Sequence, residues 1–134
     1  MPYLLDTNVI TQLLRRTPGI VGRYRAALAR GEVIYLSAVV YYEMKRGLLH
    51  VGATRQLRQL DEHFKNVLQW APVSDANWNQ AAHFWAECRR QGRPHDDDGD
   101  LLIAAQANAL GAVVVTRNTR DFADLQVAVE NWEV

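Results

Sequence analysis

The sequence of 134 residues contains a single cysteine, Cys88, which excludes an internal disulfide. It has no excess charge of either sign, because 15 acidic residues balance 15 basic ones, and this argues against a general polyanion-binding protein. No apolar run approaches the roughly 18 residues of a membrane helix, and no charged and then apolar N-terminal segment marks a secretory signal. These absences predict a protein of the reducing cytoplasm without a membrane partner.

Lysine is also scarce. Only Lys45 and Lys65 are lysines, and the other 13 basic residues are arginines. Arginine binds phosphate through paired hydrogen bonds, which lysine cannot do, and it stacks on nucleic-acid bases. A base-composition bias of the genome would give the same arginine content. The acids gather at residues 96–100, so overall neutrality is compatible with a surface divided by charge.

Length and hydrophobic pattern predict one α/β domain over residues 1–134. Apolar residues make up 49% of the chain and occur in short runs that alternate with amphipathic segments. This alternation indicates a mainly parallel sheet covered by helices on both faces. The expected strands are residues 3–5, 33–36, 68–73, 112–116 and 127–129, and the expected helices are residues 8–15, 18–30, 38–50, 53–67, 75–92 and 100–110.

The same pattern predicts that three tryptophans contribute to the core. We expect the helix that starts at Ser74 or Asp75 to bury Trp78 and Trp85 together with Ala82. We also expect Trp132 to dock the end of the chain.

The first candidate functional residue is Asp6, which ends the apolar run Tyr3–Leu5 and precedes a helix. In open α/β sheets ligands bind outside the carboxyl ends of the strands, so an acid at this point predicts chemistry. The alternative is that Asp6 or Thr7 only caps the following helix.

Two further acids, Glu43 and Asp100, lie beside apolar helical sequence. Buried carboxylates need a partner, and a divalent cation held by several carboxylates would be one. The four histidines are scattered without zinc-like spacing, so oxygen ligands point to Mg²⁺ or Mn²⁺. The alternatives are pairing of Glu43 with Arg46 or Arg23, and stabilisation of a helix N-terminus by Asp100 and Asp98.

A polar segment follows the last strong strand. Thr116 and Asn118 would lie at the carboxyl end of that strand, and Asp121 follows within one turn; alternatively, Asn118 and Thr119 form a turn and Asp121 caps a short helix. The run Asp96–Asp98 reads as a solvated loop, with Asp98 as the candidate for an accessory role.

The chain resembles the PIN-domain ribonucleases of the VapC toxin type. The matching segments span nearly the whole chain in the family's order: LDTN at 5–8, YEMKRGL at 42–48, DLLIAAQA at 100–107, VTRNTRDF at 115–122 and VENW at 129–132.

The resemblance implies a PIN-like α/β/α sandwich and a Mg²⁺- or Mn²⁺-dependent endoribonuclease that is inhibited by a cognate antitoxin. Carried over position by position, the family's acids fall on Asp6, Glu43 and Asp100, which are therefore the expected metal ligands. The family often has a fourth acid at position 118 or 121, and because residue 118 is an amide here, Asp121 is the expected fourth catalytic acid.

Other functions remain open on the sequence. A haloacid-dehalogenase-like metal-dependent phosphatase needs an acid at position 8, which is Asn8 in this chain. A receiver domain needs a lysine at the end of a late strand, and residues 113–118 contain none. A catalytically inactive PIN-like binding protein is the non-enzymatic alternative. The resemblance and the many large apolar residues also predict a homodimer, unless these residues all pack internally; they include Tyr41, Trp70, Trp78 and Trp85.

Overall fold

The computed structural model describes residues 1–133 and is built on one five-stranded sheet, β3-β2-β1-β4-β5, in which all neighbouring strands are parallel. The first strand along the chain is therefore the middle one. The strands are β1 (Tyr3–Leu5), β2 (Ile34–Ser37), β3 (Gln69–Ala71), β4 (Val113–Val115) and β5 (Val129–Glu130).

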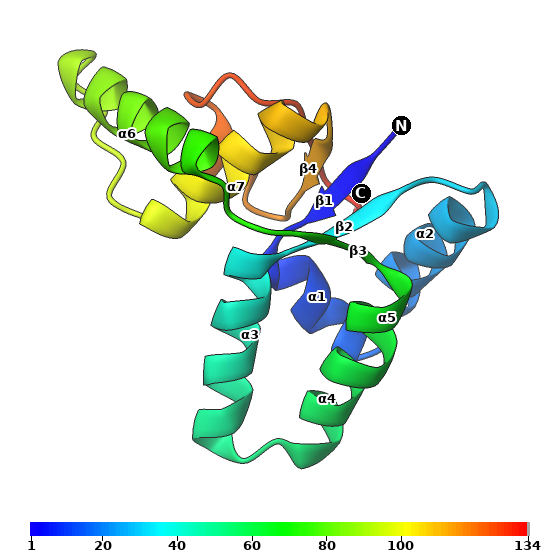
Figure 1. Cartoon of the computed structure of the whole chain (residues 1–134). Helices are drawn as coiled ribbons and strands as arrows, with labels where there is room; N and C mark the ends of the chain where they lie inside the picture. The colour runs from blue at the N-terminus through cyan, green and yellow to red at the C-terminus, as the bar shows by residue number, and fades with distance from the viewer. Residues whose placement is uncertain (134) are drawn as a thin grey trace.

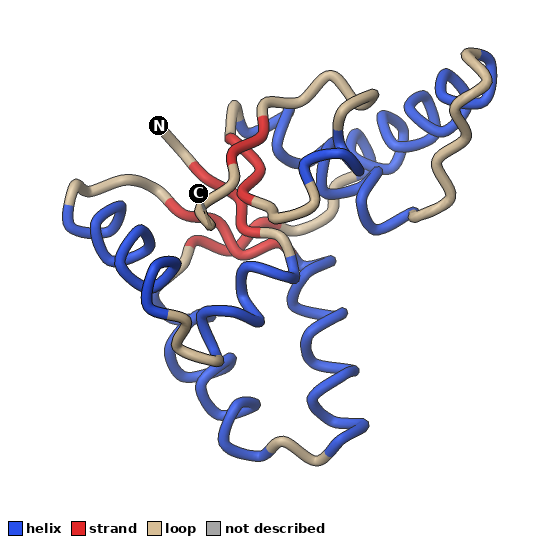
Figure 2. Tube along the Cα trace, turned by 180° about the vertical axis from the view of Figure 1, so that it is seen from behind, coloured by secondary structure: helices blue, strands red, loops and turns tan. Residues whose placement is uncertain are grey.

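Helices cover both sides of the sheet, as an α/β sandwich requires. The helices between β1 and β3 lie on one side, and α6 and α7 lie on the other (Figure 1). Seen from behind, the strands form a small central layer between the two groups of helices (Figure 2). The elements are α1 (Thr7–Leu14), α2 (Pro18–Ala29), α3 (Ala38–Val51), α4 (Thr54–Gln59), the π-helical turn η1 (Leu60–Phe64), α5 (Lys65–Val67), α6 (Asp75–Arg90), α7 (Asp98–Leu110) and the 3-10 turn η2 (Thr119–Phe122).

Local signals in the sequence set the helix ends. Ser37 caps α3 by accepting a hydrogen bond from the Val39 amide at 3.0 Å, and Ser74 and Asn77 form a capping box at the start of α6. Gly111 ends α7 at φ 62°, a left-handed conformation that glycine adopts without a steric penalty. None of the helices within residues 1–133 is long and apolar enough to cross a membrane.

The core follows from burial of the sheet on both faces. Every residue of β1 and β4 is buried, as expected for central parallel strands. Trp132 is also buried and packs edge-on against Tyr3 with ring centroids 5.3 Å apart, which confirms that it docks the end of the chain.

A buried amide fastens α7 to the carboxyl ends of β2 and β3. The Gln106 side chain accepts a hydrogen bond from the Ser37 hydroxyl at 2.6 Å and donates to the carbonyl oxygens of Ala71 and Pro72 at 2.9 and 3.2 Å. Because these partners satisfy the buried amide, its burial costs little. The contacts fix α7, which carries Asp100, against the sheet edge.

Two expectations about helices were wrong in detail. Helix α6 buries Asn77, Ala81, Phe84 and Cys88, whereas Trp78 and Trp85 are 58% and 41% exposed. The buried stripe is thus displaced by one residue from the expected one. The helix expected over residues 53–67 exists but is interrupted by the π-helical turn η1.

Candidate active site

The candidate site lies where β1 and β4, two neighbouring strands at the middle of the sheet, end. Leu5 is paired with Val115, so the next residues, Asp6 and Thr116, emerge side by side at the carboxyl edge. The Asp6 amide continues the pairing by donating to the Val115 carbonyl at 2.9 Å. Parallel pairing thus joins residues 110 positions apart in the sequence.

Asp6 is the most enclosed acid of the site, with 6% of its surface exposed. Its Oδ1 accepts a hydrogen bond from the Thr7 amide at 2.8 Å, and Asp6 therefore caps α1. Its Oδ2 accepts from the Thr116 hydroxyl at 2.9 Å and from the Asn8 amide group at 3.2 Å. This geometry is compatible with both interpretations of Asp6, because the same carboxylate caps the N-terminus of α1 and lines a pocket.

Glu43 reaches the site from the second turn of α3. Its Oε1 accepts a hydrogen bond from the Thr7 hydroxyl at 2.9 Å, which joins the carboxylate to the start of α1. The side chain is half-buried. Of its two candidate ion-pair partners, Arg46 lies over the Tyr42 ring and acts on Glu43 through its charge, whereas Arg23 pairs with Glu130.

Asp100 and Asp97 come from the start of α7. Asp97 is the N-cap residue, and its Oδ1 accepts from the Asp100 amide at 3.2 Å. Gly99 lies between this carboxylate and Glu43, because a Cβ on Gly99 would lie 3.0 Å from both Asp97 Oδ1 and Glu43 Oε2. The two oxygens therefore flank a gap that only a residue without a side chain leaves open.

These residues line one pocket of about 400 Å³. The structure brings together the four acids predicted from the sequence and Asn118, whereas Asp98 is exposed and does not line the pocket. Asp97 takes the place that we expected for Asp98. The pocket is lined by Asp6, Thr7, Asn8, Thr11, Gln12, Arg15, Glu43, Asp97, Asp100, Arg117, Asn118 and Asp121.

Sequence reasoning missed Asp97 because it placed the start of α7 two residues too late. An acid three residues before Asp100, directly ahead of a helix, is the usual signal of an N-cap. This signal places Asp97 at the N-terminus of the helix, close to the neighbouring acids.

Crowding changes the protonation of the site. Loss of hydration on burial raises the pKa of Asp100 to about 8, with further contributions from the negative charges of Asp97, Asp6, Asp121 and Glu43. Burial first, and then neighbouring carboxylates, also raises the pKa values of Asp6 and Glu43. Each ionised carboxylate therefore raises the free-energy cost of ionising its neighbours, and a bound cation would lower that cost.

The donor set fits a hard divalent cation, since it consists of carboxylate oxygens with neutral oxygens beside them. Within residues 1–133, however, no three acidic, histidine or cysteine side chains stand arranged as a finished set of metal ligands. Asp6 and Glu43 are instead directed towards hydroxyl and amide donors. The residues fit an ion that keeps several waters, as Mg²⁺ does, better than one enclosed by protein alone.

Comparison with known proteins places this geometry in context. The family model described as the PIN domain matches residues 3–128. The chain is 30% identical to the Ribonuclease VapC1 of Haemophilus influenzae (strain R2866) over 125 residues, which cover 91% of this chain and 90% of that protein. It is 28% identical to the tRNA(fMet)-specific endonuclease VapC of Shigella flexneri, with 98% of each covered.

Solved structures of other proteins share this fold. The crystal structure of VapBC2 from Rickettsia felis, bound to a DNA fragment from its promoter, contains a chain that matches with a TM-score of 0.85. The two chains are 25% identical, and the match covers 98% of this chain and 99% of that one. The sandwich described above is therefore shared almost from end to end.

The elevated pKa of Asp100 predicts how the stability of the metal-free protein depends on pH. The ordinary value is 3.8 and the folded value is about 8, so the protonated acid is compatible with folding and its ionisation opposes folding. The free energy of unfolding should fall as the pH rises from about 4 to about 8. Asp100→Asn should remove part of this decrease, which urea unfolding in EDTA at several pH values would measure.

Asp96→Asn is the matched control, because Asp96 is exposed and pairs with Arg89 outside the pocket. It should keep the wild-type pH dependence. If wild-type protein and Asp100→Asn lose stability in parallel over this pH range, the proposed crowding of Asp100 is wrong.

Proposed function

Since the chain belongs to the PIN-domain family and, within it, to the VapC-type ribonucleases of toxin–antitoxin pairs, we propose that it hydrolyses RNA with a divalent cation, Mg²⁺ or Mn²⁺, held by Asp6, Glu43 and Asp100. Residues 1–134 would act as one PIN-like ribonuclease domain. The observation that carries the proposal is the convergence of all three acids on one pocket, where burial raises the pKa of each. Such crowding costs stability and is typical of functional sites.

The bound cation would polarise the phosphodiester and lower the pKa of a bound water. The chain's own residues would set the ligands in place. Thr116 and Asn8 hold the Asp6 carboxylate from one side, and the Thr7 hydroxyl holds Glu43. Asp121 is the proposed fourth acid, since it lines the same pocket and its charge raises the pKa of Asp100.

Two arginines supply the charge that an RNA substrate needs. Arg15 and Arg117 are exposed and line the pocket together with the acids. Guanidinium groups bind phosphate oxygens through paired hydrogen bonds. They would hold the phosphates flanking the scissile bond, while the acids hold the cation. The neutral composition of the chain is compatible with this divided charge, and the arginines and acids of the pocket support it.

The competing enzyme classes do not fit the family. Neither the haloacid-dehalogenase-like phosphatase nor the receiver domain agrees with a PIN-domain match over residues 3–128. An inactive PIN-like binding protein is the remaining alternative, and the cleavage experiment below separates it from the nuclease.

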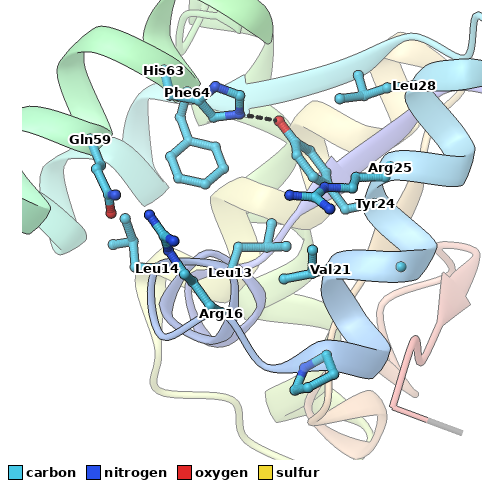
Figure 3. Close-up of a pocket in the computed structure, with 12 residues that line it drawn as sticks. Leu13, Leu14, Arg16, Val21, Tyr24, Arg25, Leu28, Gln59, His63 and Phe64 are labelled. Atoms are coloured by element: carbon cyan, nitrogen blue, oxygen red, sulfur yellow. Dashed lines mark hydrogen bonds between the residues drawn. The ribbon is translucent and has the colours of Figure 1, made fainter.

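The inhibitory partner would occupy a groove away from the acids. The groove encloses about 720 Å³ between α1, α2 and the end of α4 with η1. Leu13, Leu14, Val21 and Phe64 form apolar parts of its lining, and the Arg16 and Arg25 side chains lie beside them (Figure 3). We propose that it receives an amphipathic antitoxin segment whose acidic residues meet these arginines. VapBC complexes among the similar structures support such a partner.

A second copy of the chain is the proposed occupant of another surface. Tyr42 of α3 and Trp78 of α6 are 60% and 58% exposed and line a hollow with apolar and charged walls that adjoins the acid pocket. Its other lining residues include Val39, Val73, Leu102, Glu43, Arg46 and Asp97. Exposed aromatic residues with a polar rim are typical of protein interfaces. The exposure of Trp70, Trp78 and Trp85 argues against the alternative that all large apolar residues pack internally, although Tyr41 is partly buried.

Asp100→Asn should abolish RNA cleavage while leaving the fold intact. The substitution is nearly isosteric, but it removes a charge and a good ligand for a divalent cation. The expected loss is several kcal/mol of barrier, which is at least about a hundredfold in rate at about 1.36 kcal/mol per tenfold. Cleavage would be measured on purified tRNA, including initiator tRNA, with Mg²⁺, with Mn²⁺ and with EDTA.

Asp96→Asn should cleave at the wild-type rate, and Asp121→Asn should lose less than Asp100→Asn. If the wild-type protein cuts no RNA with either ion, the inactive alternative holds. If Asp100→Asn cuts as fast as the wild-type protein in nuclease-free preparations, the assignment of Asp100 fails.

Arg25→Glu should weaken binding of the cognate antitoxin by at least about tenfold, because it reverses a charge in the groove. Isothermal titration calorimetry would measure the affinity. Arg55→Glu changes an exposed arginine outside the groove and should bind normally. RNA cleavage should be unchanged in both variants, and equal affinities would contradict the assignment of the groove.

Tyr42→Glu should convert a wild-type dimer into a monomer in sedimentation velocity at micromolar concentration, since it places a charge in the apolar interface. Leu49→Glu is the control, because Leu49 lies on the same helix and is 58% exposed but lies outside the hollow. A monomeric wild-type protein, or a dimer that survives Tyr42→Glu, would overturn this interface.

A further inference from the structure

The side chain of His95, in the segment between α6 and α7, contacts two separate parts of the active site. Its imidazole is 17% exposed, and Nε2 lies 2.8 Å from the Asp121 carbonyl oxygen in η2. On the other side of the ring, the Asp97 amide donates to Nδ1 at 3.3 Å. Nε2 also lies 3.7 Å from Asp100 Oδ2. None of the steps proposed above uses this histidine.

The two contacts define the tautomer of the ring. Nδ1 accepts a hydrogen bond from the Asp97 amide, so it carries no proton. The ring N–H is then on Nε2, which donates it to the Asp121 carbonyl. The ring therefore joins the N-cap of α7 to the backbone of η2 in one orientation.

Phe122 anchors η2 in the core with 1% of its surface exposed, but the Asp121 carbonyl in the same turn is held by His95. The turn spans only Thr119–Phe122, and the Asp121 side chain is exposed. An ion pair between Arg93 and Asp124 also joins the two regions, but both side chains are solvent-exposed, and such pairs contribute little. Of these two polar contacts, the partly buried imidazole is the stronger one, and it holds the Asp121 backbone to the N-cap of the helix that carries Asp100.

We propose that His95 is a positioning residue that sets the separation of Asp121 from Asp97 and Asp100, and so keeps the acids ready for a divalent cation. The inference rests on the proposed metal-dependent nuclease function. Groups behind metal ligands fix their orientation, and their loss typically lowers metal affinity by about 10–100-fold. His95 would act through the acids and would not itself contact the RNA or the cation.

Two amide substitutions separate the two contacts. In His95→Gln, the terminal amide nitrogen takes the position of Nε2 and can still donate to the Asp121 carbonyl. In His95→Asn, the side-chain oxygen takes the position of Nδ1 and can still accept from the Asp97 amide, but the link to η2 is lost. A residue that only shapes the loop before α7 would be replaced better by Asn, whereas the proposed link to η2 is replaced better by Gln.

The experiment measures Mn²⁺ affinity by calorimetry, kcat and KM for RNA cleavage, and the melting temperature in EDTA. His95→Asn should lower Mn²⁺ affinity and kcat by about 10–100-fold, with little change in KM or melting temperature. His95→Gln should stay within about threefold of the wild-type protein in each quantity.

Four outcomes would overturn the proposal: equal losses in the two variants, a larger loss in Gln, no loss in Asn, or a loss in Asn that is accompanied by a lower melting temperature. A wild-type protein that binds no Mn²⁺ would overturn the proposed function and this inference together. A wild-type protein that binds Mn²⁺ while His95→Asn binds it equally well would overturn the role of His95 alone.

Discussion

The mutual repulsion of carboxylates at one edge of the sheet is the constraint on which the rest of the structure depends. Parallel strands deliver Asp6 beside Thr116, and two helices, α3 and α7, add Glu43, Asp97 and Asp100 to the same pocket. Burying these charges side by side costs free energy, because burial first and then the neighbouring carboxylates raise the pKa of Asp100. The remaining features of the site either reduce that cost or keep the acids from moving apart.

Hydrogen-bond donors and helix ends provide most of the compensation. Thr7, Asn8 and Thr116 direct donors at Asp6 and Glu43. Asp6 and Asp97 cap α1 and α7, so their charges face the positive ends of two helix dipoles. At the far side of α7, the buried Gln106 ties the helix to β2 and β3. The site is therefore held by groups that bear no charge of their own.

The sequence predicted the parts of this arrangement that depend on local pattern. Short apolar strands, glycine at helix ends and acids beside apolar sequence located the sheet and the convergence of Asp6, Glu43 and Asp100. It did not predict that Asp97 rather than Asp98 lines the pocket, because that depends on a helix start placed to within one residue. It also misplaced the buried stripe of α6, where Phe84 is inside and Trp85 outside. In an amphipathic helix, adjacent large apolar residues give nearly equal periodicity, and only packing decides between them.

The strand order also has a consequence for the time at which the protein becomes an enzyme. Because β1 pairs with both β2 and β4, the first strand to be synthesised gains its second neighbour only when residues 113–115 have been made. Asp6 leaves the ribosome 115 residues before Asp121. A nascent or prematurely terminated chain therefore carries some of the acids but cannot bring all of them together. For a ribonuclease, this order keeps the site incomplete until residue 121 has been made.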